Sequence, residues 1–167
     1  MKLKLAGGAL GAEVSGIDLT KKTDKLTYRA IRELLVEHEV LFFRQQDITH
    51  SQQYALASSF GPLQTHPAYE TIKGFPEITV LESTADKPSK IECWHSDMTF
   101  RAHPPVGTIL RSKVIPKRGG DTLWSSMTAA YNALSPGMQA FLSDLEAVHD
   151  FSYGFRESLA ERGGRER

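Results

Sequence analysis

Short apolar runs typical of β-strands recur along this chain, without the regular alternation with helices that a doubly wound sheet requires. Helices are predicted to begin directly after four residues that favour the N-cap position: Asp24, Thr49, Ser126 and Ser135. The predicted strands, about six or seven in number, favour an α+β or mostly β architecture. Beyond the extended first 20 residues, they are expected at 39–44, 77–81, 108–115, 121–124 and 146–151.

Length and charge narrow the class of protein. A chain of 167 residues predicts one domain over 1–167, with a charged, frayed tail at 156–167. Lys plus Arg and Asp plus Glu balance at 20 each, so charge favours neither nucleic acid nor an anionic membrane as a partner. No apolar run approaches the roughly 20 residues that span a bilayer. The single cysteine, Cys93, excludes an internal disulfide and suits the cytoplasm.

The segment Trp94-His95-Ser96-Asp97 carries the most chemical information. On an extended segment, His95 and Asp97 project from the same face with backbones about 6.6 Å apart. An imidazole nitrogen and a carboxylate oxygen could then meet on one ion, as two members of the 2-His-1-carboxylate triad that holds non-heme Fe(II). With 6 His and 20 acidic residues in 167, chance alone predicts about 0.7 pairs at this spacing. The spacing alone therefore does not distinguish a metal site from a solvated pair, and the surrounding sequence is needed to choose between them.

Cys93 shares strand parity with the pair, so a Cys/His/Asp zinc site is an alternative. However, Cys93 and Asp97 would lie about 13 Å apart along a straight strand. Zinc ligands bond at about 2.0–2.3 Å, so closure on one ion would need a bulge. We therefore interpret Cys93 as a small buried thiol.

A set of short segments in a fixed order extends nearly from one end of the chain to the other: 11–19, 40–44, 60–63, 66–69, 94–100, 104–105, 119–124, 130–131, Leu134 and 149–151. Taken together, these segments resemble the taurine dioxygenase family of Fe(II)- and 2-oxoglutarate-dependent oxygenases. The resemblance implies a double-stranded β-helix (jelly-roll) fold with flanking helices, of which this chain would be the incomplete N-terminal part.

The resemblance also implies the chemistry and its residues. His95 and Asp97 match two iron ligands, and Thr122 matches a residue that binds a carboxylate of 2-oxoglutarate. In this family 2-oxoglutarate and O2 are consumed, succinate and CO2 are released, and a small sulfonate such as taurine is hydroxylated to give sulfite. We further expect the protein to be cytoplasmic, to bind a small anion and to form a homo-oligomer. Three residues match the substrate pocket: His66, Tyr69 and Phe155.

Two departures from the family pattern leave alternatives open. Ile91 stands where taurine-specific members have an amide, so an alkyl sulfate ester or an aryloxyalkanoate is an alternative substrate. The third iron ligand and the arginine that binds 2-oxoglutarate have no counterpart, because His103 lies too close to Asp97 and His149 matches another position. This chain alone is expected to be inactive, and an inactive metal-binding fragment is the second reading.

Overall fold

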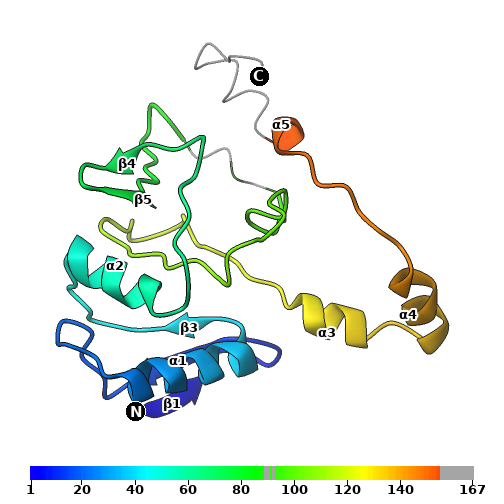
Figure 1. Ribbon diagram of the computed structural model, residues 1–167, viewed down its shortest axis with the longest axis horizontal. Coiled ribbons are helices and arrows are strands. Elements are labelled where there is room, and N and C mark those ends of the chain that lie inside the picture. The colour runs from blue at the N-terminus through cyan, green and yellow to red at the C-terminus, as the bar shows by residue number, and fades with distance from the viewer. Residues whose placement is uncertain (89–90, 92, 155–167) are drawn as a thin grey trace. The chain divides into compact units, whose positions relative to one another are not determined.

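The computed structural model describes residues 1–88, 91 and 93–154. They form two compact units (Figure 1). The first unit contains residues 1–60 and 109–146, and the second contains residues 61–108 with 147–154. The predicted tail and Phe155 lie outside the described residues.

A three-stranded sheet in the order β1-β2-β3 organises the first unit. Strand β1 (Lys2–Leu5) pairs antiparallel with β2 (Ala12–Ser15), which pairs parallel with β3 (Leu41–Phe42). Parallel neighbours need a long crossover, and helix α1 (Lys25–His38) provides it. The extended segments expected in the first 20 residues and the helix expected after Asp24 are both confirmed.

Local capping chemistry fixes where the helices of this unit begin. The side chain of Asp24 accepts from the backbone N–H of Thr27 at the start of α1. Thr49 forms a capping box with Gln52 at the start of α2 (His50–Ser58). Ser126 and Ser135 cap α3 (Met127–Asn132) and α4 (Pro136–Ser143). All four predicted N-caps are confirmed, because a cap depends on residues within one turn.

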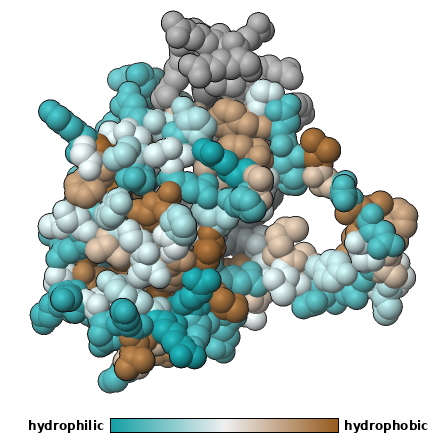
Figure 2. All heavy atoms as spheres, viewed as in Figure 1, coloured by the Kyte–Doolittle hydropathy of each residue, from teal (hydrophilic) through white to brown (hydrophobic). Residues whose placement is uncertain are grey.

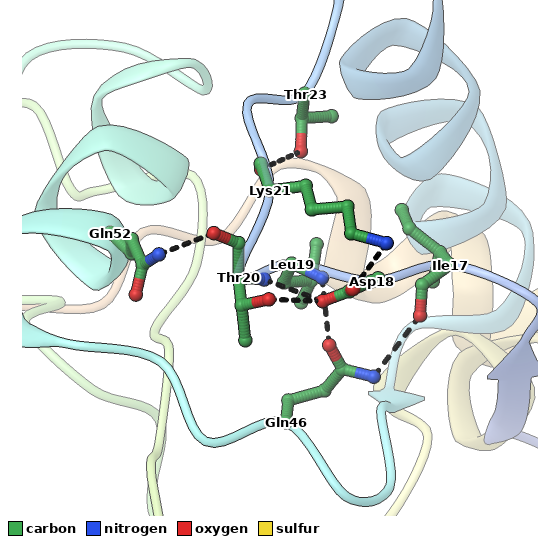
Figure 3. A network of polar contacts seen from close by, with 8 residues as sticks. All are labelled: Ile17, Asp18, Leu19, Thr20, Lys21, Thr23, Gln46 and Gln52. Atoms are coloured by element: carbon green, nitrogen blue, oxygen red, sulfur yellow. Dashed lines mark hydrogen bonds and ion pairs between the residues drawn. The ribbon is translucent and has the colours of Figure 1, made fainter.

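The core of the first unit is a small apolar cluster between α1 and α2. Its buried members are Leu19, Ile31, Ile48 and Leu56. Polar contacts fasten the segment before α1 beside this cluster (Figure 3). The amide of Gln46 accepts from the backbone N–H of Leu19 (2.8 Å) and donates to the carbonyl of Ile17 (3.1 Å). One side chain thus acts as a backbone partner for an irregular segment.

The second unit contains a hairpin and a short helix. Strand β4 (Thr71–Ile72) pairs antiparallel with β5 (Phe75–Thr79) through a turn in which Gly74 has φ 85°. Only glycine adopts such a φ at little cost, so the Lys73-Gly74 turn sets this hairpin. Helix α5 (Phe151–Gly154) follows an extended segment.

Several predicted strands are wrong. The strand expected at 39–44 is reduced to Leu41–Phe42, and the one expected at 77–81 lies at Phe75–Thr79. Segments 108–115 and 121–124 form no strand, and 146–151 runs instead into a helix. A strand exists only where a neighbour accepts its ladder hydrogen bonds, and the described residues offer these segments none. Among the described residues, more lie in helices than in strands. The predicted α+β class is therefore confirmed, whereas these residues do not meet the prediction of a mostly β fold.

Large apolar side chains remain exposed on the segments without strand partners. Val114 is 89% exposed and Ile115 68%. Helix α4 also carries exposed apolar residues, seen as brown spheres in Figure 2. Among the residues with described positions, no helix combines the length and apolar character needed to cross a bilayer.

Candidate metal and substrate site

His95 and Asp97 converge as their spacing predicts. Nε2 of His95 lies 3.2 Å from Oδ1 of Asp97, and both side chains are about half exposed. The segment that carries them is not a β-strand. The two side chains therefore converge without the strand that was expected to place them on one face. A turn begins at Asp97, where Met98 has φ 55° and its carbonyl accepts from the backbone N–H of Arg101.

The second ring nitrogen of His95 determines which atom faces Asp97. Nδ1 lies 2.8 Å from the carbonyl oxygen of Cys93, and a carbonyl only accepts, so Nδ1 carries the proton. In the neutral ring Nε2 then presents a lone pair toward the Asp97 carboxylate. Two lone pairs at this distance repel unless a cation or a proton lies between them. Metal-binding histidines commonly show this arrangement, with the other ring N–H bonded to a carbonyl.

The donor set therefore fits a divalent metal ion, with Nε2 of His95 and Oδ1 of Asp97 as ligands. No group of three His, Cys, Asp or Glu side chains that could hold an ion occurs among the described residues. Cys93 contributes its backbone carbonyl rather than its thiol. The prediction that this thiol is buried is wrong, because Cys93 is exposed.

His66 and Tyr69 lie side by side, as a shared pocket requires. Their ring centroids are 4.5 Å apart with a 34° tilt. The backbone N–H of Ala68 donates to Nδ1 of His66 at 3.1 Å, so in the neutral ring Nε2 carries the proton. The Tyr69 hydroxyl is a second donor on the same short segment.

Burial sets the protonation of both residues. Partial burial lowers the pKa of His66; the nearby Asp97 carboxylate opposes this and the Arg101 guanidinium reinforces it. Burial, followed by the charge of Asp97, raises the pKa of Tyr69. Both groups are therefore neutral hydrogen-bond donors near pH 7. Asp97 acts electrostatically on both, so the second unit brings together the candidate metal ligand and the candidate substrate residues.

An aromatic cluster that the sequence did not single out completes this part of the site. The Phe151 ring lies 6.2 Å from the His66 ring and 4.7 Å from that of Phe100. Phe155, the predicted pocket aromatic, lies outside the described residues. Phe100 and Phe151 both fall within segments that match the family, and this match was the sequence signal that could have pointed to them.

Thr122 lies in the first unit, exposed and outside any helix or strand. It follows a bend at 117–119. Gly119 and Gly120 have φ of 72° and 71°, and a Cβ on Gly120 would approach Cγ of Pro116 to 3.2 Å. Glycine is therefore required here for both conformation and space.

The chain belongs to the family described as "Taurine catabolism dioxygenase TauD, TfdA family", which it matches over residues 2–167. It is 37% identical to an alkylsulfatase of Acinetobacter baylyi over 156 residues, which are 93% of this chain and 49% of that protein. It is 34% identical to an alpha-ketoglutarate-dependent sulfate ester dioxygenase of Pseudomonas putida, covering 89% of this chain and 49% of that protein. The chain thus spans about half the length of these relatives.

Solved structures agree with the family assignment. A taurine dioxygenase from Burkholderia xenovorans superposes with a TM-score of 0.78 at 38% identity, over 90% of this chain and 53% of that one. The protein AAD-2, solved with Mn(II) and N-oxalylglycine, superposes with a TM-score of 0.70 at 27% identity, over 100% of this chain and 57% of that one. The chain therefore shares its fold with about half of each of these proteins.

Proposed function

We propose that this chain carries part of the active site of an Fe(II)- and 2-oxoglutarate-dependent dioxygenase that hydroxylates a small organic sulfur oxyanion. The observation that carries the proposal is the convergence of His95 Nε2 and Asp97 Oδ1, with His95 Nδ1 held by a carbonyl. The family membership and the names of the relatives support the same reaction class. The overall change is the oxidation of substrate and 2-oxoglutarate by O2 to the hydroxylated product, succinate and CO2.

His95 and Asp97 would hold the iron, and Thr122 would bind a carboxylate of 2-oxoglutarate through its hydroxyl. When bound, iron and 2-oxoglutarate supply the activation of O2 and the cleavage of an unactivated C–H bond. The protein itself positions the ligand side chains. The carbonyl of Cys93 orients the His95 ring so that the correct nitrogen faces the ion.

His66 and Tyr69 would orient the substrate anion. Nε2–H of His66 and the Tyr69 hydroxyl are two neutral donors on rings 4.5 Å apart, which suits the oxygens of a tetrahedral sulfur group. The Phe151 ring lies edge-on to the ring of His66, and Phe100 packs against Phe151, so apolar rings adjoin the pair. Fixing the sulfur group in this way would present the adjacent carbon for hydroxylation.

An alkyl sulfate ester is the substrate class we favour. The aliphatic side chain of Ile91 cannot make the hydrogen bond that taurine-specific members make from this position. Two of the relatives are named for sulfate esters or alkyl sulfates. Hydroxylation of the carbon attached to the ester oxygen gives a product that collapses to an aldehyde and inorganic sulfate.

A small sulfonate such as taurine remains the second substrate class, since a taurine dioxygenase is among the similar structures. Hydroxylation next to the sulfonate would release sulfite instead of sulfate. Aryloxyalkanoates are the third class, because a 31% identical relative of Cupriavidus pinatubonensis is named a 2,4-dichlorophenoxyacetate dioxygenase. The released product therefore distinguishes the classes.

The test uses the polypeptide encoded by the complete reading frame. Anaerobic Fe(II) and 2-oxoglutarate should produce a weak visible charge-transfer band, which His95→Ala and Asp97→Ala abolish. His103→Ala, a matched control six residues beyond Asp97, should keep the band. A band retained in both His95→Ala and Asp97→Ala would refute the metal assignment. Sulfate or sulfite release across a panel of esters and sulfonates then identifies the substrate class.

A non-catalytic metal-binding role is the second candidate function. The finding that favours it is that the part of the chain with described positions offers two ligands and no third. In that case metal binding would depend on His95 and Asp97, yet 2-oxoglutarate would not be consumed. We expect the 167-residue chain alone to bind Fe(II) weakly and to turn over little.

Three further expectations remain predictions. We expect residues 1–167 to fold within a single domain, the enzyme to act in the cytoplasm, and the protein to form a homo-oligomer. The last is consistent with the exposed apolar side chains of α4.

A further inference from the structure

Two side chains join the loop that carries His66 and Tyr69 to the turn that follows the metal-ligand pair. Nε2 of Gln64 donates to the carbonyl oxygen of His103 at 2.9 Å. In the opposite direction, Nη2 of Arg101 donates to the carbonyl oxygen of Thr65 at 3.2 Å. We call these two reciprocal hydrogen bonds the clasp.

The clasp acts directly beside the candidate site residues. Thr65 precedes His66, and Arg101 lies in the turn that begins at Asp97. The backbone N–H of Arg101 donates to the carbonyl of Met98 at 3.0 Å, so the side chain of Arg101 starts from a fixed backbone position. The clasp therefore sets the position of the anion-binding donors relative to the ligand carboxylate.

Arg101 carries a positive charge near His66, whereas His66 itself is neutral. Nδ1 of His66 accepts from the Ala68 N–H, so protonating that nitrogen would cost a hydrogen bond. Burial also lowers the pKa of His66, and Arg101 lowers it further, against the opposing charge of Asp97. His66 is thus a neutral donor. An anionic substrate needs a positive charge from another group, and Arg101 lies within electrostatic range.

Arg101 is suited to this task by its remaining donors. The guanidinium has five N–H groups in a planar fork, and its contact with Thr65 uses one nitrogen. Its carbon also lies 5.7 Å from the centroid of the Phe100 ring, which belongs to the aromatic cluster around His66.

We propose that Arg101 is a positioning and specificity-determining residue: it holds the loop of His66 and Tyr69 through Thr65 and favours anionic over neutral substrates. This inference rests on the proposed function. The shared chemistry of its ligand is a tetrahedral sulfur oxyanion, either a sulfate monoester or a sulfonate, and both are arms of the test.

The variants separate charge from the clasp. Arg101→Met removes the charge and one clasp bond, Arg101→Lys keeps the charge, and Gln64→Leu removes only the other clasp bond. In the polypeptide of the complete reading frame, Arg101→Met should raise KM for sulfate esters and sulfonates by roughly three- to tenfold, as expected for one partly solvated charge. The kcat should change less than twofold. Arg101→Lys should restore most of the affinity, and Gln64→Leu should raise KM less than Arg101→Met does.

Equal KM values for wild type and Arg101→Met would overturn the proposal. So would equal effects of Arg101→Met and Gln64→Leu, because the clasp alone would then explain both. A neutral analogue of the same length should show only a small KM rise in Arg101→Met, similar to that in Gln64→Leu, because it loses a clasp bond and no charge interaction. If its KM rose as much as that of the anion, the specificity role would be refuted.

A second measurement stays informative if the enzyme activity is not as proposed. In the metal-free 167-residue chain, NMR titration of the His66 ring should show a higher pKa in Arg101→Met than in wild type, with no rise in Gln64→Leu. An unchanged pKa in Arg101→Met would overturn the placement of Arg101. If wild type shows no turnover but the NMR result holds, the proposed function fails while the electrostatic coupling stands.

Discussion

The hydroxyl of Ser126 donates a hydrogen bond of 2.8 Å to a carboxylate oxygen of Glu39, which lies 87 positions earlier in the chain. Ser126 is buried, and its oxygen also accepts from the backbone N–H of Ala129 at the start of α3. Glu39 ends α1 with φ 63°, a conformation that costs free energy in any residue other than glycine. One buried hydroxyl therefore links the junction of α1 and β3 to the start of α3.

Ser126→Ala should lower the free energy of unfolding of the first unit by about 1–3 kcal/mol, because it removes the cap and the partner of Glu39 together. Ser135→Ala is the matched control, since Ser135 caps α4 through Met138 and is exposed. Denaturant unfolding followed by Trp124 fluorescence in a Trp94→Phe background measures both. Equal losses in the two variants would show that the bond to Glu39 contributes nothing.

Gln46→Ala should also destabilise the first unit, by about 1–3 kcal/mol, because three backbone groups lose their partner. The Gln46 amide accepts from Leu19 and donates to the carbonyls of Ile17 and Arg44. Gln139→Ala removes one exposed hydrogen bond to Tyr131 and should cost less than about 0.5 kcal/mol. The same fluorescence assay compares them, and a loss for Gln46→Ala no larger than for Gln139→Ala would contradict this account.

The sequence predicted the features that depend on neighbours along the chain. The four helix caps require residues within one turn, and each was found from the cap residue alone. The convergence of His95 and Asp97 was predicted from a two-residue spacing, and it holds on a segment that is not a strand. A short separation limits where two side chains can point, whatever the segment pairs with.

Features that depend on distant partners could not be predicted in this way. The runs at 108–115 and 121–124 have strand-type residues, but the described residues provide no neighbouring strand. The approach of Phe151 to His66 joins residues 85 positions apart, and no pattern along the chain encodes it. The roles of Thr122 and Phe155 were taken from the family resemblance and stay predictions.

The pKa of His66 predicts a pH dependence of stability. Burial holds it below the ordinary value of 6.5, so between the two values the unfolded chain binds more protons than the folded chain. The free energy of unfolding should therefore be highest above about pH 6.5 and should decrease as the pH drops through the lower pKa of His66 in the folded state. His66→Asn removes the titrating ring but keeps an acceptor for the N–H of Ala68.

The measurement is the free energy of unfolding from pH 5 to 8 in wild type and His66→Asn, with the His66 ring titrated by NMR. The difference between the two proteins should grow in favour of wild type as the pH rises toward 6.5 and then stay constant. A difference that does not change with pH would mean that His66 is not buried as described.

Two contacts of neighbouring residues hold the segment that carries Thr122, the residue proposed to bind 2-oxoglutarate. The Trp124 ring packs edge-on against Phe42 of β3, with centroids 5.5 Å apart. Ser126 is bonded to Glu39. Because both anchors follow Thr122 within four residues, they restrain the backbone of this segment without a strand ladder.

Thr122→Val should therefore weaken the binding of 2-oxoglutarate by roughly ten- to a hundredfold while Fe(II) binding stays unchanged, since one hydrogen bond to a carboxylate is lost. Thr122→Ser should restore binding, because it keeps the hydroxyl. Anaerobic titration of the visible band with 2-oxoglutarate, in the polypeptide of the complete reading frame, measures this directly. The assignment fails if Thr122→Val binds 2-oxoglutarate as wild type does. Loss of the band at every 2-oxoglutarate concentration in Thr122→Ser would show instead that the threonine methyl group, and not its hydroxyl, maintains the site.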